Sequence, residues 1–307
     1  MPSHLKNMTL RQLRALAATV RGGSLTAAAE ALGVTQPAVT LQLQNLQELA
    51  SMPLIQRTPD GVSVTDAGRE VLRLDARIGV ALADCIAALE AIKNAGGGRV
   101  AIGAVSTAKY FVPAAIAAFK KLHPGIELKL TIGNRAQIMD GLRNFSLDVA
   151  ITGRPPDDID LEKRLIGPHP HIVIAPWGHP LTYEKGLKLE DLMQETFLLR
   201  EPGSGTRGLM ERLFDDAGLS PRIGMEIDSN ETIKQAVIAG LGIALISAHT
   251  VASEIEYRRI VALHVEGLPV MRQWFVLRRA DKHLLPPAGA LMDFLATEAA
   301  GFWPAVA

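Results

Sequence analysis

The sequence predicts an α+β multidomain protein, with a small helical region first, a long helix next and a larger α/β region last. Two short helical patterns joined by a glycine-containing turn occupy residues 24–46. Apolar residues with heptad spacing then cover residues 66–94, and strand and helix patterns alternate from residue 99 onward. This change from helical spacing to strand–helix alternation separates a helical region from an α/β region.

The composition is that of a globular chain of two or three domains. The chain has 307 residues, of which 48% are hydrophobic, and a formal net charge of +0. Its single cysteine excludes an internal disulfide framework and fits a reducing compartment. We see no apolar signal segment near the N-terminus and no run of about 18 apolar residues that would cross a membrane. We therefore expect a cytoplasmic protein without a membrane partner.

Residues 24–46 have the pattern of a helix-turn-helix. Ser24 is placed to cap the first short helix, and Gly33 is placed to end it in a left-handed turn. Thr35 can cap the second helix, whose first turn holds Pro37, where a missing N–H breaks no hydrogen bond. Two short helices joined by such a turn are the signature of this motif.

A β-hairpin is expected directly after the helix-turn-helix. Two short apolar runs, Leu54–Arg57 and Val62–Val64, flank Asp60-Gly61, and Asp-Gly between such runs is a strong hairpin signal. A hairpin in this place makes the winged form of the motif. We therefore predict a winged helix-turn-helix domain over residues 1–65.

A long linker helix is expected over residues 66–95. Four apolar residues spaced by seven form a stripe along it, which favours pairing with a second helix. A lone amphipathic helix could give the same spacing, but we expect no other element of the N-terminal region to cover this stripe. The predicted dimerisation residues are Val71, Ile78, Cys85 and Ile92.

The glycine-rich stretch Asn94–Gly98 is expected to be a hinge before an effector-binding domain over residues 96–307. Strand and helix patterns alternate through this domain, which indicates an α/β sheet. Two such units joined by crossovers leave a cleft between lobes. We expect one lobe from about residues 99–164 plus 268–300 and the other from about residues 165–267.

The second helix of the motif carries an amide-rich face instead of the Lys and Glu of an ordinary solvated helix. Gln and Asn pair with adenine through two hydrogen bonds, and the methyl group of Thr contacts that of thymine. Such a face favours reading of A·T-rich double-stranded DNA, with phosphate contacts left to flanking groups and helix N-termini. Taken alone, the same side chains are equally typical of a soluble surface. The predicted DNA-binding residues are Ser24, Thr35, Gln36, Pro37, Thr40, Gln42, Gln44, Asn45 and Arg57.

Polar side chains stand at the starts of three predicted helices of the α/β region, each after a predicted strand. Free N–H groups and the dipole at a helix N-terminus attract anions. Lys109, Arg154 and Arg200 can neutralise such a ligand, although each of them could also form an ordinary surface ion pair. Ser, Thr and Asn are also common helix caps, so one such start alone carries little weight. Together they favour a small anionic effector bound at Ser106, Thr107, Ser204, Gly205, Thr206 and Asn230.

Four motifs follow one another in the first part of the chain. They are LRQL at residues 10–13, SLTAAAEALGVTQPAVTLQLQNL at 24–46, PLIQR at 53–57 and TDAG at 65–68. In this order and spacing they resemble the LysR-type transcriptional regulators. The rest of the chain resembles the effector-binding domain of that family, which implies a two-lobed, periplasmic-binding-protein-like fold. Residues 105–130, VSTAKYFVPAAIAAFKKLHPGIELKL, most resemble the CbbR subgroup, regulators of Calvin-cycle (RuBisCO) operons.

The resemblance implies an effector site at the helix starts named above and adds the loop of Thr152, Gly153 and Arg154. It also implies a homodimer with antiparallel linker helices that assembles further to a tetramer; RNA polymerase is a further candidate partner. The subgroup implies control of carbon-fixation genes by a phosphorylated metabolite or a nicotinamide nucleotide, without a cofactor or a metal. A LysR-type regulator of a different metabolic operon stays open as the alternative.

Two other classes of protein compete with a DNA-binding regulator. An enzyme is not expected, because the sequence has no dinucleotide fingerprint, no Walker loop and no H-E-x-x-H motif. A cytoplasmic solute-binding module would share the α/β fold, but a transport protein of this kind would need export. The pair His169 and His171 is a weak hint of a metal site, and a location at a strand edge is favoured instead. Cys85 is expected to be structural.

Overall fold

The computed structural model of the chain describes residues 7–59, 61–93 and 98–304. The chain forms two compact units, Met1–Ile86 and Ala87–Ala307. Most of the predicted hinge Asn94–Gly98 lies outside the described residues.

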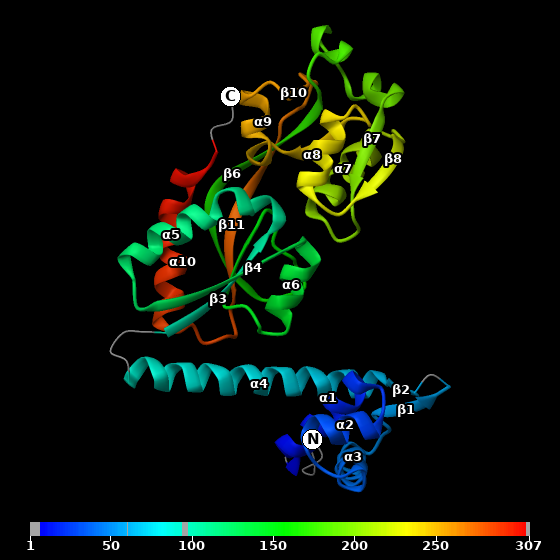
Figure 1. Cartoon of the computed structure of the whole chain (residues 1–307), viewed down its shortest axis with the longest axis vertical. Coiled ribbons are helices and arrows are strands. Elements are labelled where there is room, and N and C mark those ends of the chain that lie inside the picture. Colours follow the sequence, from blue (N-terminus) through cyan, green and yellow to red (C-terminus); the bar gives the residue numbers. More distant parts are fainter. Residues whose placement is uncertain (1–6, 60, 94–97, 305–307) are drawn as a thin grey trace. The chain divides into compact units, whose positions relative to one another are not determined.

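The first unit is a winged helix-turn-helix, as the sequence predicts (Figure 1). Its elements are α1 (Leu10–Gly22), α2 (Leu25–Leu32), α3 (Gln36–Ala50) and the antiparallel strands β1 (Ile55–Thr58) and β2 (Gly61–Val64). Ser24 caps α2, because its hydroxyl accepts a hydrogen bond from the N–H of Ala27 at 3.1 Å. Gly33 ends α2 in the left-handed conformation, with φ of +65°, which turns the chain toward α3.

Apolar side chains from all three of these helices form the core of the first unit. Leu16, Leu46 and Leu54 are fully buried there, and Ala28 is a small contact residue that lets α1 and α2 approach closely. Gln47 holds the start of the wing on α3, because its Oε1 accepts from the N–H of Leu54 at 2.9 Å. The wing is therefore fastened to the same helix that carries the amide-rich face.

The helix α4 (Asp66–Lys93) begins at the TDAG motif. The hydroxyl of Thr65 accepts from the N–H of Gly68 at 3.1 Å and donates to the carbonyl of Pro53 at 2.8 Å. A Cβ atom at Gly68 would lie 2.0 Å from the carbonyl oxygen of Leu54. The motif therefore needs glycine at this position so that α4 can pass directly against the chain before the wing.

The apolar stripe of α4 is divided between the core of the first unit and the surface. Val71 is buried in that core and Ile78 packs against it, so the expectation that nothing else in this region covers the stripe is wrong for these two residues. Cys85 is exposed, and the side chain of Ile92 lies outside the described residues. The exposed large apolar residues of this helix, called the α4 stripe below, are Leu74, Leu82, Ile86 and Leu89.

The second unit is an α/β fold on a seven-stranded sheet with strand order β10-β6-β11-β5-β3-β4 and with β9 also paired to β6. A separate parallel pair is formed by β7 and β8. In chain order the elements are β3 (Gly98–Val105), the 3-10 helix η2 (Ser106–Tyr110), α5 (Val112–Leu122), β4 (Ile126–Gly133), α6 (Arg135–Arg143), β5 (Val149–Thr152), β6 (Leu161–Pro176), β7 (Thr196–Arg200), α7 (Gly205–Asp216), β8 (Arg222–Ile227), α8 (Asn230–Ile238), β9 (Ala244–Ser247), α9 (Ala252–Glu256), β10 (Ile260–Ala262), β11 (Val270–Arg279) and α10 (Pro286–Glu298).

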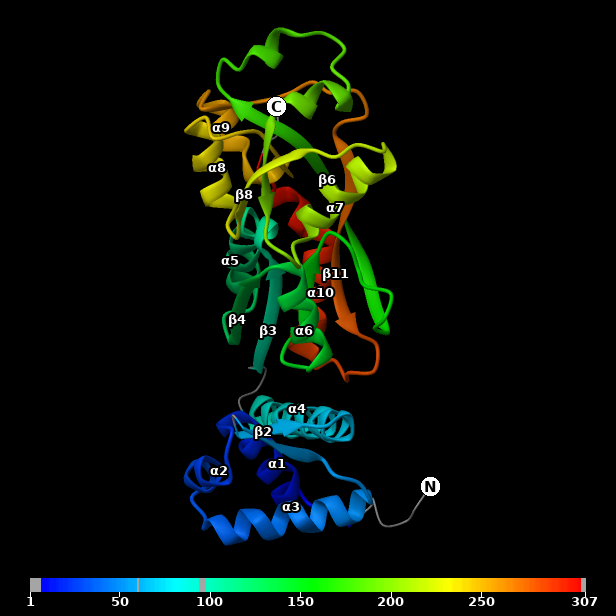
Figure 2. The same ribbon diagram turned by 90° about the vertical axis from the view of Figure 1, so that its right-hand side faces the viewer.

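Two long antiparallel strands, β6 and β11, run through both lobes of this unit (Figures 1 and 2). Strands β3, β4 and β5 extend the sheet in the first lobe, and β9 and β10 pair with the end of β6 in the second. The predicted lobe limits cut β6 after residue 164 and give all of β11 to one lobe. The two strands are continuous across these limits, so the lobes share a common backbone.

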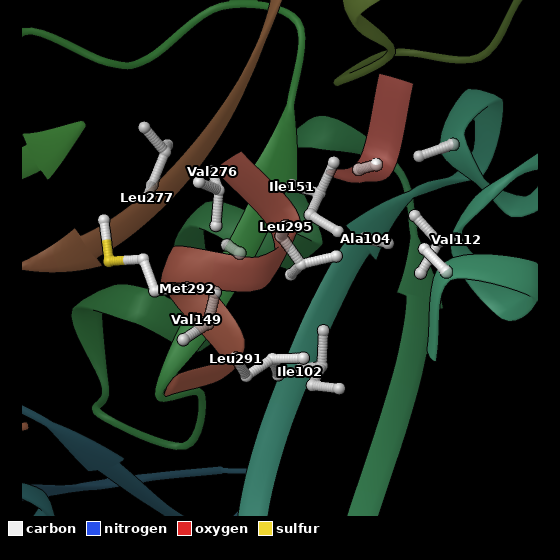
Figure 3. Close-up of a cluster of buried hydrophobic side chains, with 14 of the residues drawn as sticks. Ile102, Ala104, Val112, Val149, Ile151, Val276, Leu277, Leu291, Met292 and Leu295 are labelled. Atoms are coloured by element: carbon white, nitrogen blue, oxygen red, sulfur yellow. The ribbon is translucent and has the colours of Figure 1, made fainter. Parts of the chain in front are cut away.

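Helices α5 and α10 cover the sheet of the first lobe. Figure 3 shows Ile102 of β3 and Ile151 of β5 among the side chains of α10 that include Leu291 and Leu295. All four side chains are completely buried. Burying one such side chain contributes about 1.5–3 kcal/mol, so this cluster holds rigid the strands whose ends reach the site.

The sheet of the second lobe has a core on each of its two faces. Val173 and Ile174 are neighbours on β6 and therefore point to opposite faces. Val173 packs in the cluster with Phe214 of α7, and Ile174 packs in the cluster with Val237 of α8. Both helices are thereby fixed with their N-termini at one end of the sheet.

Candidate functional site

The face of α3 opposite its core carries the predicted DNA-reading side chains. Val39, Leu43 and Leu46 bury one side of the helix, and Pro37 and Gln44, seven residues apart, lie on the opposite side. Gln36, Pro37 and Gln44 are exposed, and Thr40, Gln42 and Asn45 are half-buried. Gln44 is thus the predicted amide that lies most directly on the free face.

One detail of this helix differs from the sequence interpretation. Thr35 stands at the N-terminus of α3, but its side chain makes no capping hydrogen bond. The hydroxyl of Thr40 donates to the carbonyl of Gln36 at 3.0 Å, so the methyl group is what Thr40 can offer to a base. Arg57 lies in β1, and its side chain is outside the described part of the chain.

A pocket in the second unit collects most of the predicted effector residues. It lies where the ends of β3 and β5 meet the N-termini of α6 and α7, beside β6 and β11. Its empty volume is about 380 Å³, open solvent at its mouth included. The predicted residues that line it are Ser106, Thr107, Thr152, Arg154, Arg200, Ser204, Gly205 and Thr206; the other lining residues are Val105, Asn134, Arg135, Gly153, His169, His171 and Arg272.

Three arginines bring uncompensated positive charge to this pocket. Its lining residues include Arg135, Arg154 and Arg272 but no carboxylate. Burial first, and then the charges of Arg212, Arg154 and Arg135, lower the pKa of Arg272 to about 10. Burial followed by the charge of Arg154 also lowers the pKa of Arg135. These arginines lack an anionic partner in the pocket, so the pocket favours a negatively charged ligand.

The backbone holds the arginines in place. Arg272 of β11 donates to the carbonyls of Gly205 at 3.4 Å and Gly153 at 3.5 Å, which belong to different lobes. Arg135 donates from Nε to the carbonyl of Arg154 at 3.2 Å. Carbonyl oxygens orient the guanidinium groups without neutralising them, so the positive charge stays available to a ligand.

Two helix N-termini add partial positive charge to the pocket. Ser204 caps α7 by accepting from the N–H of Arg207 at 3.5 Å. Asn134 caps α6 and forms a capping box with Gln137. Because both caps line the pocket, the free N–H groups of two helices add to its attraction for an anion.

Arg200 connects the lobes instead of standing free. It is only 3% exposed and pairs with the carboxylate of Glu201 at 2.8 and 3.0 Å. It also donates to the side-chain oxygen of Asn230 and, at 3.3 Å, to the hydroxyl of Ser106. Glu201 balances the charge of Arg200, so the geometry does not favour the predicted role of Arg200 in neutralising a ligand. It favours a role for Arg200 and Asn230 in positioning Ser106.

Lys109 does not line the pocket. Its Nζ lies 3.3 Å from the carboxylate of Glu231 on α8, and the hydroxyl of the neighbouring Tyr110 donates to the same carboxylate. Burial and then Glu231 raise the pKa of Tyr110, so its hydroxyl keeps its proton. These contacts join η2 of the first lobe to α8 of the second.

The lobes also meet at the start of α6. The N–H of Ala136 donates to the carbonyl of Gly203 at 3.2 Å. Gly203 has φ of +84°, and a Cβ atom there would lie 2.9 Å from that of Ala136. Glycine at this position therefore permits both the turn before α7 and the approach of the first lobe.

The prediction of a strand edge for His169 and His171 is wrong. Both are buried near the middle of the sheet, because β11 pairs along one side of β6 and β9 along the other. Burial is the main cause that lowers the pKa of His171 to about 3 and that of His169 well below its usual value. Both rings are therefore neutral at physiological pH and form a wall of the pocket.

Sequence reasoning missed Asn134, Arg135 and Arg272. Asn134 directly follows a strand pattern, so it could have been found by the same reasoning that identified Ser204. Arg272 stands alone in an alternating strand, and Arg135 is an ordinary helix residue, so neither carries a local signal. Only the tertiary fold brings them beside Arg154.

Comparisons with known proteins agree with this architecture. The model of the bacterial regulatory helix-turn-helix proteins of the lysR family matches residues 10–69, and that of the LysR substrate binding domain matches residues 93–300. The HTH-type transcriptional regulator CbbR of Xanthobacter flavus is 52% identical over 298 residues, which are 96% of this chain and 90% of that relative. The RuBisCO operon transcriptional regulator of Allochromatium vinosum is 42% identical over 294 residues, 96% of this chain and 97% of its own.

One solved structure bears on the second unit in particular. The regulatory domain of CcmR from Synechocystis PCC6803, in complex with 2-PG, superposes with a TM-score of 0.63 and 36% sequence identity. It covers 65% of this chain and 96% of its own. The similarity therefore spans the unit that contains the pocket.

The chain belongs to the LysR family of bacterial regulatory helix-turn-helix proteins. It is a DNA-binding transcriptional regulator and not an enzyme, which confirms the fold class and the class of function predicted from the sequence. Within the family it is most like the CbbR regulators.

Two features are absent from the residues that the structure describes. None of their helices is both long and apolar enough to span a membrane. No group of three or more His, Cys, Asp or Glu among them is placed to hold a metal ion.

Replacing Arg272 by methionine is expected to stabilise the ligand-free protein and to abolish its response to phosphate. The charged form of Arg272 is disfavoured by burial and by three neighbouring arginines, so a neutral side chain of similar length relieves that repulsion. A gain of about 1 kcal/mol corresponds to a rise in Tm of about 2–4 °C. Thermal unfolding of the full chain, with and without phosphate at constant ionic strength, measures both effects.

The matched control is Arg222→Met, which removes an exposed arginine from β8. This control should leave both the Tm and its phosphate dependence unchanged. A lower Tm for Arg272→Met, together with an intact phosphate response, would contradict the assignment of Arg272 to an anion site.

Proposed function

We propose that this regulator controls carbon-fixation genes and that a small anion bound in the pocket of its second unit tunes its action on DNA. The gene target is supported by relatives named CbbR and RuBisCO operon transcriptional regulator, which share 52% and 42% of their residues with this chain. The ligand class rests on one observation above all: the pocket is lined by three arginines besides Arg200, which pairs with Glu201, and its lining residues include no carboxylate.

The size of the pocket favours a short phosphorylated acid as the effector. Only about 30 Å³ of the pocket is open to the centres of water-sized spheres, which suits a ligand with a few carbon atoms better than a nicotinamide nucleotide, the larger of the two predicted classes. The CcmR domain that binds 2-PG is 36% identical in this unit, which supports 2-phosphoglycolate as the first compound to test.

The amide-rich face of α3 is proposed to read the major groove of double-stranded DNA. Gln44 is exposed on the side of the helix away from Val39 and Leu43, where an amide can reach a base edge. A bidentate amide–adenine pair supplies sequence discrimination, whereas Ser24 and the helix N-termini can only add phosphate contacts.

The α4 stripe is proposed to pair two copies of the chain. Its residues are between 38% and 57% exposed, which is unusual for four apolar residues along one helix. A second α4 would bury them, and the antiparallel pairing implied by the family resemblance would do so in both copies.

The first experiment adds 2-phosphoglycolate to the full chain. A ligand that binds only the folded state must raise the Tm, and it should also change the footprint of the regulator on promoter DNA. The change in DNA affinity should be modest, corresponding to a coupling of about 1–3 kcal/mol. Glycolate, which lacks the phosphate, is the control and should do neither. If 2-phosphoglycolate altered neither the Tm nor the footprint, this ligand would have to be abandoned.

Replacing Gln44 by alanine is expected to lower affinity for specific DNA by about 1–3 kcal/mol, because a bidentate base contact is lost. Affinity for random DNA should barely change. Fluorescence anisotropy with both DNAs measures the difference, and Gln235→Ala, an exposed glutamine of α8, is the matched control. Equal losses on both DNAs would assign Gln44 to the sugar–phosphate backbone.

Replacing Ile86 by aspartate is expected to shift the protein toward monomer, because a charge in a paired apolar stripe is left without a partner. Leu241→Asp places the same charge on a comparably exposed apolar residue away from α4 and serves as the control. Sedimentation analysis of both variants measures the assembly. An Ile86→Asp variant that sediments like the wild-type protein would exclude the α4 stripe as the pairing surface.

A further inference from the structure

The pocket is lined by two chemically different kinds of group. The guanidinium groups of Arg135, Arg154 and Arg272 are one kind, and the neutral ring of His169 is the other. His169 is 3% exposed, and its Nε2 lies 2.9 Å from the hydroxyl of Ser247. Its Nδ1 is also buried but has no hydrogen-bond partner among the described residues. A buried polar atom without a partner destabilises the folded protein, so its presence in a binding pocket calls for an explanation.

Packing fixes the ring of His169 in one orientation. The ring stacks on that of Trp274, with centroids 3.7 Å apart and planes inclined by 16°. The bond to Ser247 on β9 holds its far edge. The imidazole cannot turn to find a partner for Nδ1 without breaking one of these contacts.

Gly153 leaves the free nitrogen uncovered. A Cβ atom at this position would lie 2.7 Å from Nδ1 of His169. Gly153 is not among the glycines with positive φ, so its backbone does not itself require glycine. Glycine at this position is therefore explained by the space beside the histidine ring, which a side chain would fill.

Neighbouring positions on β6 and β11 bring the histidine and one of the arginines together. His169 is directly opposite Arg272 in the strand register, so the two α-carbons are about 4.5–5.5 Å apart. A ligand with one group on the arginine and another on the histidine must therefore be short. His171 does not compete for that role, because its Nδ1 already lies 3.2 Å from the carbonyl of His169.

We infer that His169 is a specificity-determining residue of the effector site, whose Nδ1–H donates to a carboxylate or carbonyl oxygen on a ligand held at its phosphate end by the arginines. The hydroxyl of Ser247 then donates to Nε2, which leaves the ring proton on Nδ1. This inference rests on the proposed function and adds the residue that recognises the second polar group of a short phosphorylated acid. Burial keeps the pKa of His169 well below its usual value, so the ring acts as a neutral donor and adds no further charge.

The test compares two ligands on three proteins. 2-Phosphoglycolate carries the second acceptor, and ethyl phosphate has the same length but ends in a methyl group. Isothermal titration of each into the full chain, its His169→Phe variant and its Arg272→Met variant gives six affinities. Phenylalanine keeps a flat ring on Trp274 but has no nitrogen.

His169→Phe should weaken 2-phosphoglycolate by about ten- to a hundredfold, the worth of a hydrogen bond to a charged group, and change ethyl phosphate by less than about threefold. Arg272→Met should weaken both ligands. Equal losses of both ligands in His169→Phe, or no loss of either, would overturn the inference while leaving the proposed anion site intact. If neither ligand bound the wild-type chain, the proposed ligand class would fall and this inference with it.

A second variant covers the case in which His169→Phe does not fold. Gly153→Ala keeps every polar group but places a methyl group against Nδ1, and should selectively weaken 2-phosphoglycolate in the same way. Nitrogen-15 NMR of histidine-labelled protein gives an independent readout. 2-Phosphoglycolate should move the Nδ1 resonance of His169 to the position of a protonated nitrogen, whereas ethyl phosphate should not. A Nδ1 resonance unchanged by 2-phosphoglycolate would contradict the inference.

Discussion

The antiparallel pairing of β6 with β11 is the constraint on which the second unit depends. Ten consecutive residues of β11, from Val270 to Arg279, pair with β6, so one hydrogen-bonded ladder serves both lobes. The ladder places Arg272 opposite His169 and carries β5 and β9 on its two flanks. The pocket therefore lies at a fixed point of the sheet, and the ladder holds Arg272 and His169 at a fixed spacing.

This arrangement gathers groups that are unfavourable in the absence of a ligand. The arginines repel one another, and this repulsion contributes to the lowered pKa values of Arg272 and Arg135. Nδ1 of His169 is buried without a hydrogen-bond partner among the described residues. A fold selected only for stability would replace these side chains by apolar ones. Their presence is consistent with a site in which ligand binding supplies both the missing negative charge and the missing hydrogen bond.

Much of the first unit could be predicted because its signals are local. The cap at Ser24, the left-handed Gly33 and the spacing of Val39, Leu43 and Leu46 are each decided within a few residues of sequence. The helix starts at Ser106 and Ser204 could be found in the same way, and the structure brings both to one pocket. The burial of His169 could not, because it depends on β9 and β11, which lie far along the chain. Val71 shows the same limit: heptad spacing identifies an apolar stripe but does not tell which surface covers it.

The contacts between the lobes bear on how strongly a ligand can act. The lobes are joined without any ligand by links that include Arg200 to Ser106, Tyr110 to Glu231, and Ala136 to Gly203. Because the lobes already meet, an effector does not have to create the closed arrangement and can only change its stability relative to other arrangements. The effector changes this relative stability only if it binds one arrangement of the lobes more tightly than another. A short ligand held by a few arginines and one histidine has only a limited difference in affinity between the lobe arrangements. This favours a graded change in the geometry of the DNA complex over an on–off switch in DNA binding.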